Sequence, residues 1–253
     1  TCGARRRGLA GADQRGPEAP GGGRDGAEMA GAPPRAFTWD RTGYANATGS
    51  GARRGPTTEF GLDVTGGGGV GTLSFPTLSI RVGLTQGVEF RLKPPSFLAS
   101  FVDGPGDEVF VTDTVFGFKI GKQVTDTLSL SLVPEVTIPT SGGAWQGRLE
   151  LNWALGFGVF GRNGNLAFGS APSFTGRDIT GEASLTASIQ ATEALGIYGQ
   201  TFLLWTRDQD PRPYAGAGVY AMVHERIQMD VSFDVGLTDD ADSRLRAGGG
   251  MTV

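Results

Sequence analysis

Cysteine and histidine are nearly absent from this chain of 253 residues, which has one of each. The single cysteine, Cys2, excludes a disulfide within the chain and any metal cluster built on cysteines. It offers a position for a lipid anchor, although an inert tail residue is the simpler interpretation. His224 lies in a predicted short turn, where a solvated role is usual, and no serine–histidine–acid arrangement is indicated. We therefore predict no catalytic residues, no enzyme activity and no cofactor.

Long hydrophobic runs are also missing, so the sequence contains no transmembrane helix of about 18 or more apolar residues. A mean hydropathy of -0.13 and 19% charged residues resemble a soluble protein. They do not exclude a membrane β-barrel, because only alternate residues of its strands face lipid. The chain starts at Thr1 without a hydrophobic signal region, so we expect that a signal was removed or that the sequence is a fragment.

Positive charge is scarce outside the N-terminal part. Residues 1–55 hold nine arginines and five acidic residues, about +4, whereas residues 56–253 hold 13 basic and 21 acidic residues, about -8. No basic surface therefore indicates nucleic-acid binding. We predict a disordered or loosely held extension rich in Gly, Ala, Arg and Pro over residues 1–36, and an aromatic-containing lead-in, periplasmic or in a lumen, over residues 37–55.

What the sequence does contain is strict alternation of apolar and small or polar residues, clearest in residues 148–170. Leu149, Leu151 and Trp153 have one parity, and Glu150 and Asn152 have the other. This period predicts a strand with one apolar face, and its length suits a tilted strand that crosses a membrane. Residues 161–164, which contain Asn-Gly, are expected to form the tight hairpin turn.

The alternation continues from residue 56 to the C-terminus and predicts about twelve strands. Short turns fall near residues 85, 124, 163, 193 and 225, while longer connections fall near 100, 143, 174, 210 and 240, including loops at 94–108 and 171–177. The predicted fold is therefore all-β, an antiparallel up-and-down transmembrane β-barrel over residues 56–253, located in the outer membrane. A soluble β-sandwich or lipocalin-like protein is the alternative, but the strands are uniformly long and their polar face is rich in Gly, Ser and Thr. Interfacial aromatic girdles are expected from Trp145, Trp153, Trp205, Tyr198, Tyr214 and Tyr220.

The polar parity predicts a lumen lined with charges of both signs. The candidate lumen residues are Glu59, Asp63, Arg81, Glu89, Arg91, Lys93, Lys119, Glu135, Glu150, Asn152, Glu182, Gln190, Asp230, Asp234, Arg244 and Arg246. Arg81, Glu89 and Arg91 are expected to form a charge cluster near the periplasmic mouth. Two interpretations stay open: a salt-bridged interior that makes the barrel rigid, or a water-filled path for polar solutes. Asp239, Asp240 and Asp242 are weak calcium candidates in what we interpret as a solvated acidic loop.

Four segments carry a family resemblance that covers residues 38–253: residues 38–44, 73–92, 134–143 and 236–240 with the final strand. They are similar to the outer-membrane transporter family associated with the meta-pathway of phenol degradation. Thr42 replaces a usual proline of that family, and the chain stops at Val253 where such barrels usually end on an aromatic residue. The resemblance implies a transmembrane β-barrel that takes up small hydrophobic or aromatic compounds.

Together these observations predict an outer-membrane transporter or channel for small, hydrophobic or aromatic molecules. Its expected partners are membrane lipid, lipopolysaccharide and a small-molecule solute. The alternative is a closed structural barrel, or a subunit of a larger envelope assembly without transport activity. In that alternative, the arginine-rich tail plugs the lumen or binds an envelope protein.

Overall fold

The computed structural model describes residues 56–67, 70–102, 107–140, 142–239 and 241–252. The predicted extension and lead-in, residues 1–55, lie outside this part of the chain. Among the described residues, no helix is long and apolar enough to cross a membrane. In the described ranges the secondary structure consists of fifteen strands: β1 (Thr57–Gly67), β2 (Val70–Phe75), β3 (Ser79–Thr85), β4 (Val88–Lys93), β5 (Phe97–Val102), β6 (Glu108–Val111), β7 (Thr114–Gln123), β8 (Leu128–Ile138), β9 (Gln146–Val159), β10 (Arg162–Thr175), β11 (Asp178–Gln190), β12 (Leu195–Thr206), β13 (Arg212–His224), β14 (Ile227–Gly236) and β15 (Ser243–Thr252).

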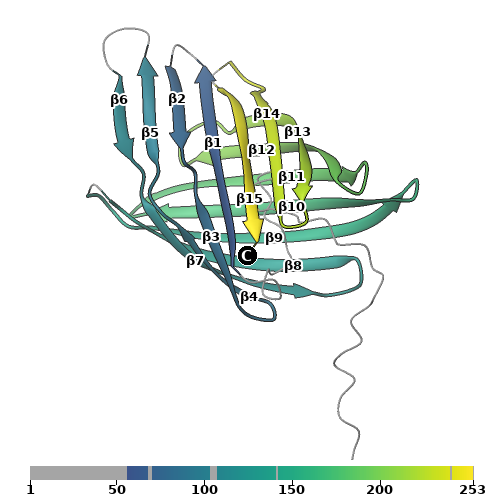
Figure 1. Cartoon of the computed structure of the whole chain (residues 1–253). Helices are drawn as coiled ribbons and strands as arrows, with labels where there is room; N and C mark the ends of the chain where they lie inside the picture. Colours follow the sequence, from purple (N-terminus) through teal and green to yellow (C-terminus); the bar gives the residue numbers. More distant parts are fainter. Residues whose placement is uncertain (1–55, 68–69, 103–106, 141, 240, 253) are drawn as a thin grey trace, which may run out of the picture. The chain divides into compact units, whose positions relative to one another are not determined.

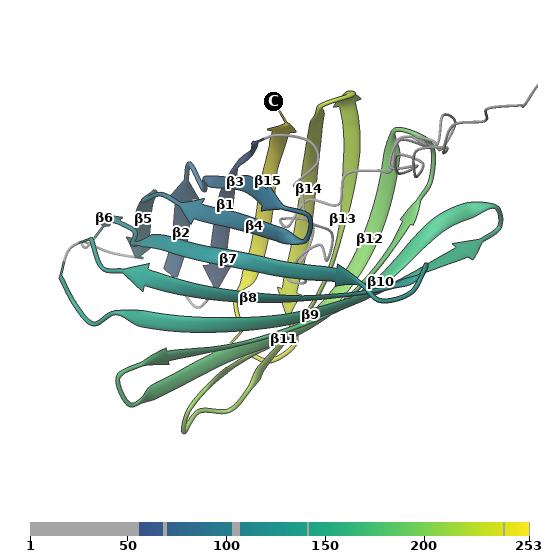
Figure 2. The ribbon, with the colours of Figure 1, turned by 90° about the horizontal axis from the view of Figure 1, so that it is seen from below.

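The strands form one antiparallel sheet that closes on itself (Figures 1 and 2). Closure comes from β15, which pairs with β1 from Thr57↔Thr252 to Gly66↔Ser243. On its other side, β1 pairs with β3 near its start and with β2 near its end, so β2 and β3 occupy one position in the barrel. In the same way, β4 and β5 occupy one position in the barrel, and β6 and β7 occupy the next. The fold is thus a closed 12-strand antiparallel β-barrel, and the predicted architecture and strand number are confirmed.

Two of the three interruptions coincide with prolines. Pro76 separates β2 from β3, and Pro94 with Pro95 separates β4 from β5, because proline has no backbone N–H to donate to a sheet. The predicted loop at residues 94–108 is therefore wrong in part. Its apolar run Phe97–Val102 is strand β5, which pairs with β2 from Phe75↔Phe97 to Val70↔Val102. Because this short run does not alternate apolar and polar residues, its sequence pattern did not indicate a strand.

Two connections also differ from the prediction. Residues 171–177 are not a loop, because β10 continues to Thr175 and pairs with β11 up to Thr175↔Asp178. The hairpin turn that joins β9 to β10 is formed by Phe160 (φ 49°) and Gly161 (φ 72°), rather than by residues 161–164. Two consecutive positive φ values match the turn type whose twist suits a two-residue hairpin.

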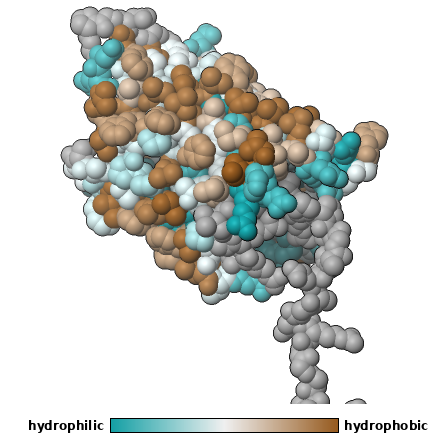
Figure 3. Space-filling view, viewed as in Figure 1, coloured by the Kyte–Doolittle hydropathy of each residue, from teal (hydrophilic) through white to brown (hydrophobic). Residues whose placement is uncertain are grey.

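The barrel carries apolar side chains outside and polar side chains inside, as β8 illustrates. Leu130, Leu132 and Val136 are 37–42% exposed, whereas Ser131 and Glu135 are at most 4% exposed. Apolar side chains cover much of the face of the molecule that is seen in Figure 3. A closed sheet leaves no unpaired strand edge, which is what a lipid environment requires. This distribution suits a barrel that spans a membrane.

The prediction of interfacial aromatic residues is wrong for three of the six side chains, the tyrosines. Tyr198, Tyr214 and Tyr220 are 2–8% exposed and lie on the inner face, where they alternate with outward Ile197, Ala215 and Val219. Tyrosine in a barrel strand follows the parity of its position. The glycines Gly218 and Gly196 face the rings of Tyr198 and Tyr220 on neighbouring strands and leave room for them inside.

Candidate functional site: the barrel lumen

The inner face can be described from its two ends. We call the end that holds Thr57, Thr252 and the turns at 86–87, 124–127, 160–161, 191–194 and 225–226 the terminal end. The opposite end, with the connections at 139–145, 176–177, 207–211 and 237–242, is the loop end. Three groups of interacting polar side chains line the wall between them.

The first group lies near the terminal end and joins β1, β3 and β4. Arg81 pairs with Glu59 at 2.8 Å and lies 3.8 Å from Glu89, which in turn pairs with the Nε of Arg91 at 3.0 Å. All four side chains are at most 6% exposed. Register explains the contact between Arg81 and Glu89: Arg81 is directly opposite Arg91, so Glu89, two residues before Arg91 on the same face, is diagonal to Arg81. The structure thus brings together Arg81, Glu89 and Arg91, and Lys119 on β7 faces Glu89 across the next pairing.

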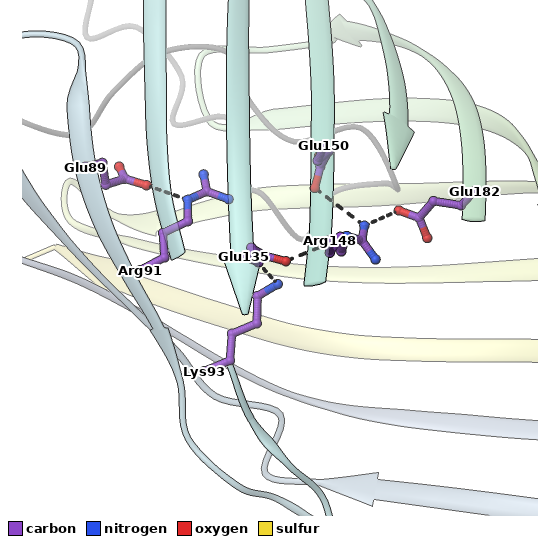
Figure 4. A network of polar contacts seen from close by, with 7 residues as sticks. All are labelled: Glu89, Arg91, Lys93, Glu135, Arg148, Glu150 and Glu182. Carbon is purple, nitrogen blue, oxygen red and sulfur yellow. Dashed lines mark hydrogen bonds and ion pairs between the residues drawn. The ribbon is translucent and has the colours of Figure 1, made fainter. Parts of the chain in front are cut away.

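The second group is centred on Arg148 of β9 (Figure 4). Its guanidinium lies 3.7 Å from Glu135 of β8, 3.5 Å from Glu150 of β9 and 2.5 Å from Glu182 of β11. Lys93 of β4 donates a hydrogen bond of 2.8 Å to the second carboxylate oxygen of Glu135. Arg148 therefore links β8, β9 and β11, and Lys93 adds β4 through Glu135; we call this network the Arg148 hub.

Small residues on β10 let the Arg148 hub form. Glu182 belongs to β11, so Arg148 must reach across the intervening strand β10. On β10, Ser173 is opposite Arg148 and Ala171 is opposite Glu182. Because neither side chain is long, the guanidinium can pass over β10 to the carboxylate. Three carboxylates with two cations also keep each buried charge near a charge of opposite sign.

The third group is centred on Asp234 of β14, whose side chain is fully buried. Its two oxygens accept hydrogen bonds from Gln200 Nε2 at 2.5 Å and from Arg246 at 2.6 Å. Gly216 lies beside it on β13, where a Cβ atom would approach an Asp234 oxygen to 1.9 Å. Glycine at this position therefore leaves the room that the Asp234 carboxylate occupies over β13.

An aromatic pair lies next to this group. The rings of Phe202 and Tyr214 stack with centroids 4.6 Å apart at an interplanar angle of 6°. The guanidinium of Arg244 lies over both rings, 5.0 Å from the Tyr214 centroid and 6.0 Å from that of Phe202. Such a cation–π arrangement stabilises a desolvated arginine. It places one cationic and two aromatic side chains on the same part of the wall.

The other predicted residues lie apart from these groups or at their margins. Asp63 is opposite Arg246 in the β1–β15 pairing, and Asp230 is opposite Tyr220 and Gly248. Gln190 donates a hydrogen bond to the carbonyl of Glu193 at the terminal end. Of the calcium candidates, Asp239 and Asp242 belong to the β14–β15 connection, and Asp240 lies outside the described residues. Within the described ranges, no group of three or more His, Cys, Asp or Glu residues could hold a metal.

Sequence reasoning missed Arg148, the centre of the largest network. Its parity is that of Glu150 and Asn152, so the same alternation that placed those residues in the lumen would have placed Arg148 there. Gln200 and Phe202 were missed for a different reason. The segment 195–206 is apolar at nearly every position, and its phase becomes clear only from the pairing with β11 and β13.

Comparisons with known proteins support the fold. No protein-family model matches the sequence, and a search of curated proteins gives no significant match. Among solved structures, an outer membrane channel from Pseudomonas putida F1 is similar, with a TM-score of 0.59, 11% identity and coverage of 83% of this chain and 98% of that one. The KdgM porin in complex with disordered oligogalacturonate has a TM-score of 0.55 at 10% identity, covering 78% and 99%. The NanC porin has a TM-score of 0.54 at 9% identity, covering 78% and 100%. The chain thus has the fold of outer-membrane β-barrels.

Proposed function

We propose that the protein is an outer-membrane channel through which small solutes diffuse along the barrel lumen. The observation that carries the proposal is the inversion of polarity, with apolar residues outside the closed sheet and charged residues inside it. The similar solved structures described as channels or porins support it. In this account the surrounding lipid and lipopolysaccharide contact the outer face, and the solute contacts the inner one.

The proposed roles of the lumen residues follow from their contacts. The Arg148 hub and the group around Arg81 hold neighbouring strands in register, because Glu59, Glu135 and Glu182 each contact an arginine of another strand. These two groups contain cations and carboxylates in nearly equal numbers, so they add little net charge to the wall. The channel therefore has weak selectivity between anions and cations. We assign the same lining role to the remaining inward charges, Asp230, Asp234, Arg244 and Arg246.

The solute class is the finer part of the proposal. The family resemblance implies hydrophobic or aromatic solutes, and the stacked pair of Phe202 and Tyr214 is the described feature that favours them. Most inner side chains are charged or carry hydroxyl and amide groups, which favours polar solutes. An aromatic carboxylate such as benzoate tests the first class, and a sugar tests the second.

A closed structural barrel is the second candidate. Large side chains on the inner face, among them Lys119, Glu150 and Asn152, are less than 2% exposed. Such burial is expected for a packed interior that holds the barrel rigid. It would exclude solutes larger than water unless inner side chains move.

Liposome swelling distinguishes the two candidates. Purified protein is reconstituted into liposomes, and swelling is followed after addition of arabinose, gluconate or benzoate. The channel proposal predicts swelling above that of protein-free liposomes for at least one solute, and faster swelling with smaller ones. Rates equal to protein-free liposomes for every solute would contradict the channel and support the closed barrel.

A further inference from the structure

One part of the inner wall differs from the charged groups described above. Along β8, β9, β11 and β12, toward the terminal end, the inward residues carry no charge. We call five of them the neutral strip: Ser131, Asn152, Ser184, Thr186 and Gln200. Their register makes them neighbours, since Ser131 is opposite Asn152 and Thr186 is opposite Gln200. Between Asn152 and Ser184, β10 contributes only Gly169.

Most polar side-chain atoms of the neutral strip have no hydrogen-bond partner among the described residues. All five side chains are at least 94% buried, and Asn152 is fully buried. Among the described residues, neither amide atom of Asn152 has a hydrogen-bond partner, and the same holds for the hydroxyls of Ser131, Ser184 and Thr186. Gln200 uses its amino group on Asp234, but its carbonyl oxygen has no partner in the same part of the chain.

A buried polar atom without a partner costs about 1–3 kcal/mol, so a row of them is costly to keep for stability alone. Their chemistry indicates what would satisfy them. Hydroxyl groups both donate and accept, and the amide of Asn152 offers both functions on one side chain. An ionic solute would instead be favoured beside unlike charge, which the neutral strip does not provide.

We infer that the neutral strip, when inner side chains move and expose it, binds uncharged, polyhydroxylated solutes of sugar size. The solute hydroxyls then give up hydrogen bonds to water and form hydrogen bonds to these side chains. This inference rests on the proposed channel function and names its solute class. The small residues beside the strip, Ala154, Ala167 and Gly169, project little into the lumen at this height of the barrel. The solute would pass there rather than along β3 and β4, where arginines project.

Three six-carbon sugar derivatives of similar size test the inference: glucose, gluconate as the anion and glucosamine as the cation. Swelling of proteoliposomes is measured for each with the full chain. The expected order places glucose first. Two shape-preserving variants, Asn152→Leu and Thr186→Val, should each slow glucose roughly three- to tenfold, the effect of one lost hydrogen bond or two, and leave gluconate unchanged. Heat-dependent gel mobility checks that each variant is a folded barrel.

The matched control is Ser170→Ala, which removes a hydroxyl from the outward face of β10, where Ser170 pairs with exposed Leu151. Glucose swelling should not change in this variant. Gluconate or glucosamine faster than glucose, or equal slowing in Ser170→Ala and Thr186→Val, would overturn the inference while the channel proposal stands. Absence of swelling with all three solutes would overturn the inference, and absence of swelling with arabinose and benzoate as well would overturn the channel proposal with it.

Discussion

At the scale of single residues, the lumen depends on where a side chain is missing as much as on where a charge is present. Ala171 and Ser173 let Arg148 cross β10 to Glu182, and Gly216 makes room for Asp234. Alternation in the sequence predicts which residues point inward. It does not predict which of them touch, because contacts depend on strand register and on the size of residues on intervening strands.

Removing the cation of the Arg148 hub should destabilise the barrel. In Arg148→Met, three carboxylates lose their shared partner, and we expect a loss of about 3 kcal/mol, the low end for a broken buried ion pair because Arg148 is 28% exposed. Denaturant unfolding in detergent measures it. The control is Arg207→Met, since Arg207 is 61% exposed and its guanidinium contacts the exposed Asp208 at 3.8 Å and the carbonyl oxygen of Arg177 at 3.4 Å. Equal midpoints for the two variants would refute the structural role of the hub.

Gly216→Ala should disrupt the third group of the lumen. The added Cβ would lie 1.9 Å from an Asp234 oxygen and 2.7 Å from the carbonyl oxygen of Phe233, so the backbone must shift. We expect a loss of about 1–3 kcal/mol in denaturant unfolding, typical of overpacking. Gly158→Ala is the matched control, because nothing lies within 4 Å of its Cβ position. A stable Gly216→Ala would mean that this close approach is not required.

At the scale of strands and turns, prediction from sequence was most accurate where alternation was strict. The β9–β10 hairpin was located from its parity, although its turn was placed too late. The preference of Asn-Gly for tight turns drew the prediction to residues 163–164, but these residues pair within β10 against Gly158 and Phe157. Strand β5 was missed because its six residues are apolar or small throughout, and only the pairing with β2 defines it.

The conformation of the β9–β10 turn predicts that Gly161 tolerates few substitutions. Its φ of 72° is in the left-handed region, where a side chain with a branched Cβ is strained. Gly161→Val should therefore cost about 1–2 kcal/mol in denaturant unfolding, whereas Gly161→Asn should cost less. If the turn instead used residues 163–164, the backbone strain would make Gly164→Val more destabilising than Gly161→Val. A Cβ at position 164 would also collide with the Phe157 ring, so the decisive comparison is between the unfolding free energies of Gly161→Val and Gly161→Asn.

At the scale of the whole molecule, closure of the sheet decides the interpretation. Alternation alone fits a β-sandwich as well as a barrel, and the β15–β1 pairing resolves this choice in favour of the barrel. Closure turns one face of every strand toward lipid and collects the charged side chains on the other. Function could not be predicted to the same depth, since a polar lumen follows from the fold whereas the solute depends on contacts between side chains of distant strands.

The central claim is that solutes pass through the lumen of this barrel, and cysteine labelling combined with single-channel recording tests it most directly. Cys2 is first replaced by serine, which leaves no other cysteine in the chain. Ser184→Cys then places a thiol on the inner face of β11, and Leu185→Cys places one on the outer face, where Leu185 is 43% exposed. A charged thiol reagent should lower the conductance of Ser184→Cys and leave that of Leu185→Cys unchanged. Absence of conductance, or equal sensitivity of the two variants, would contradict passage through the lumen.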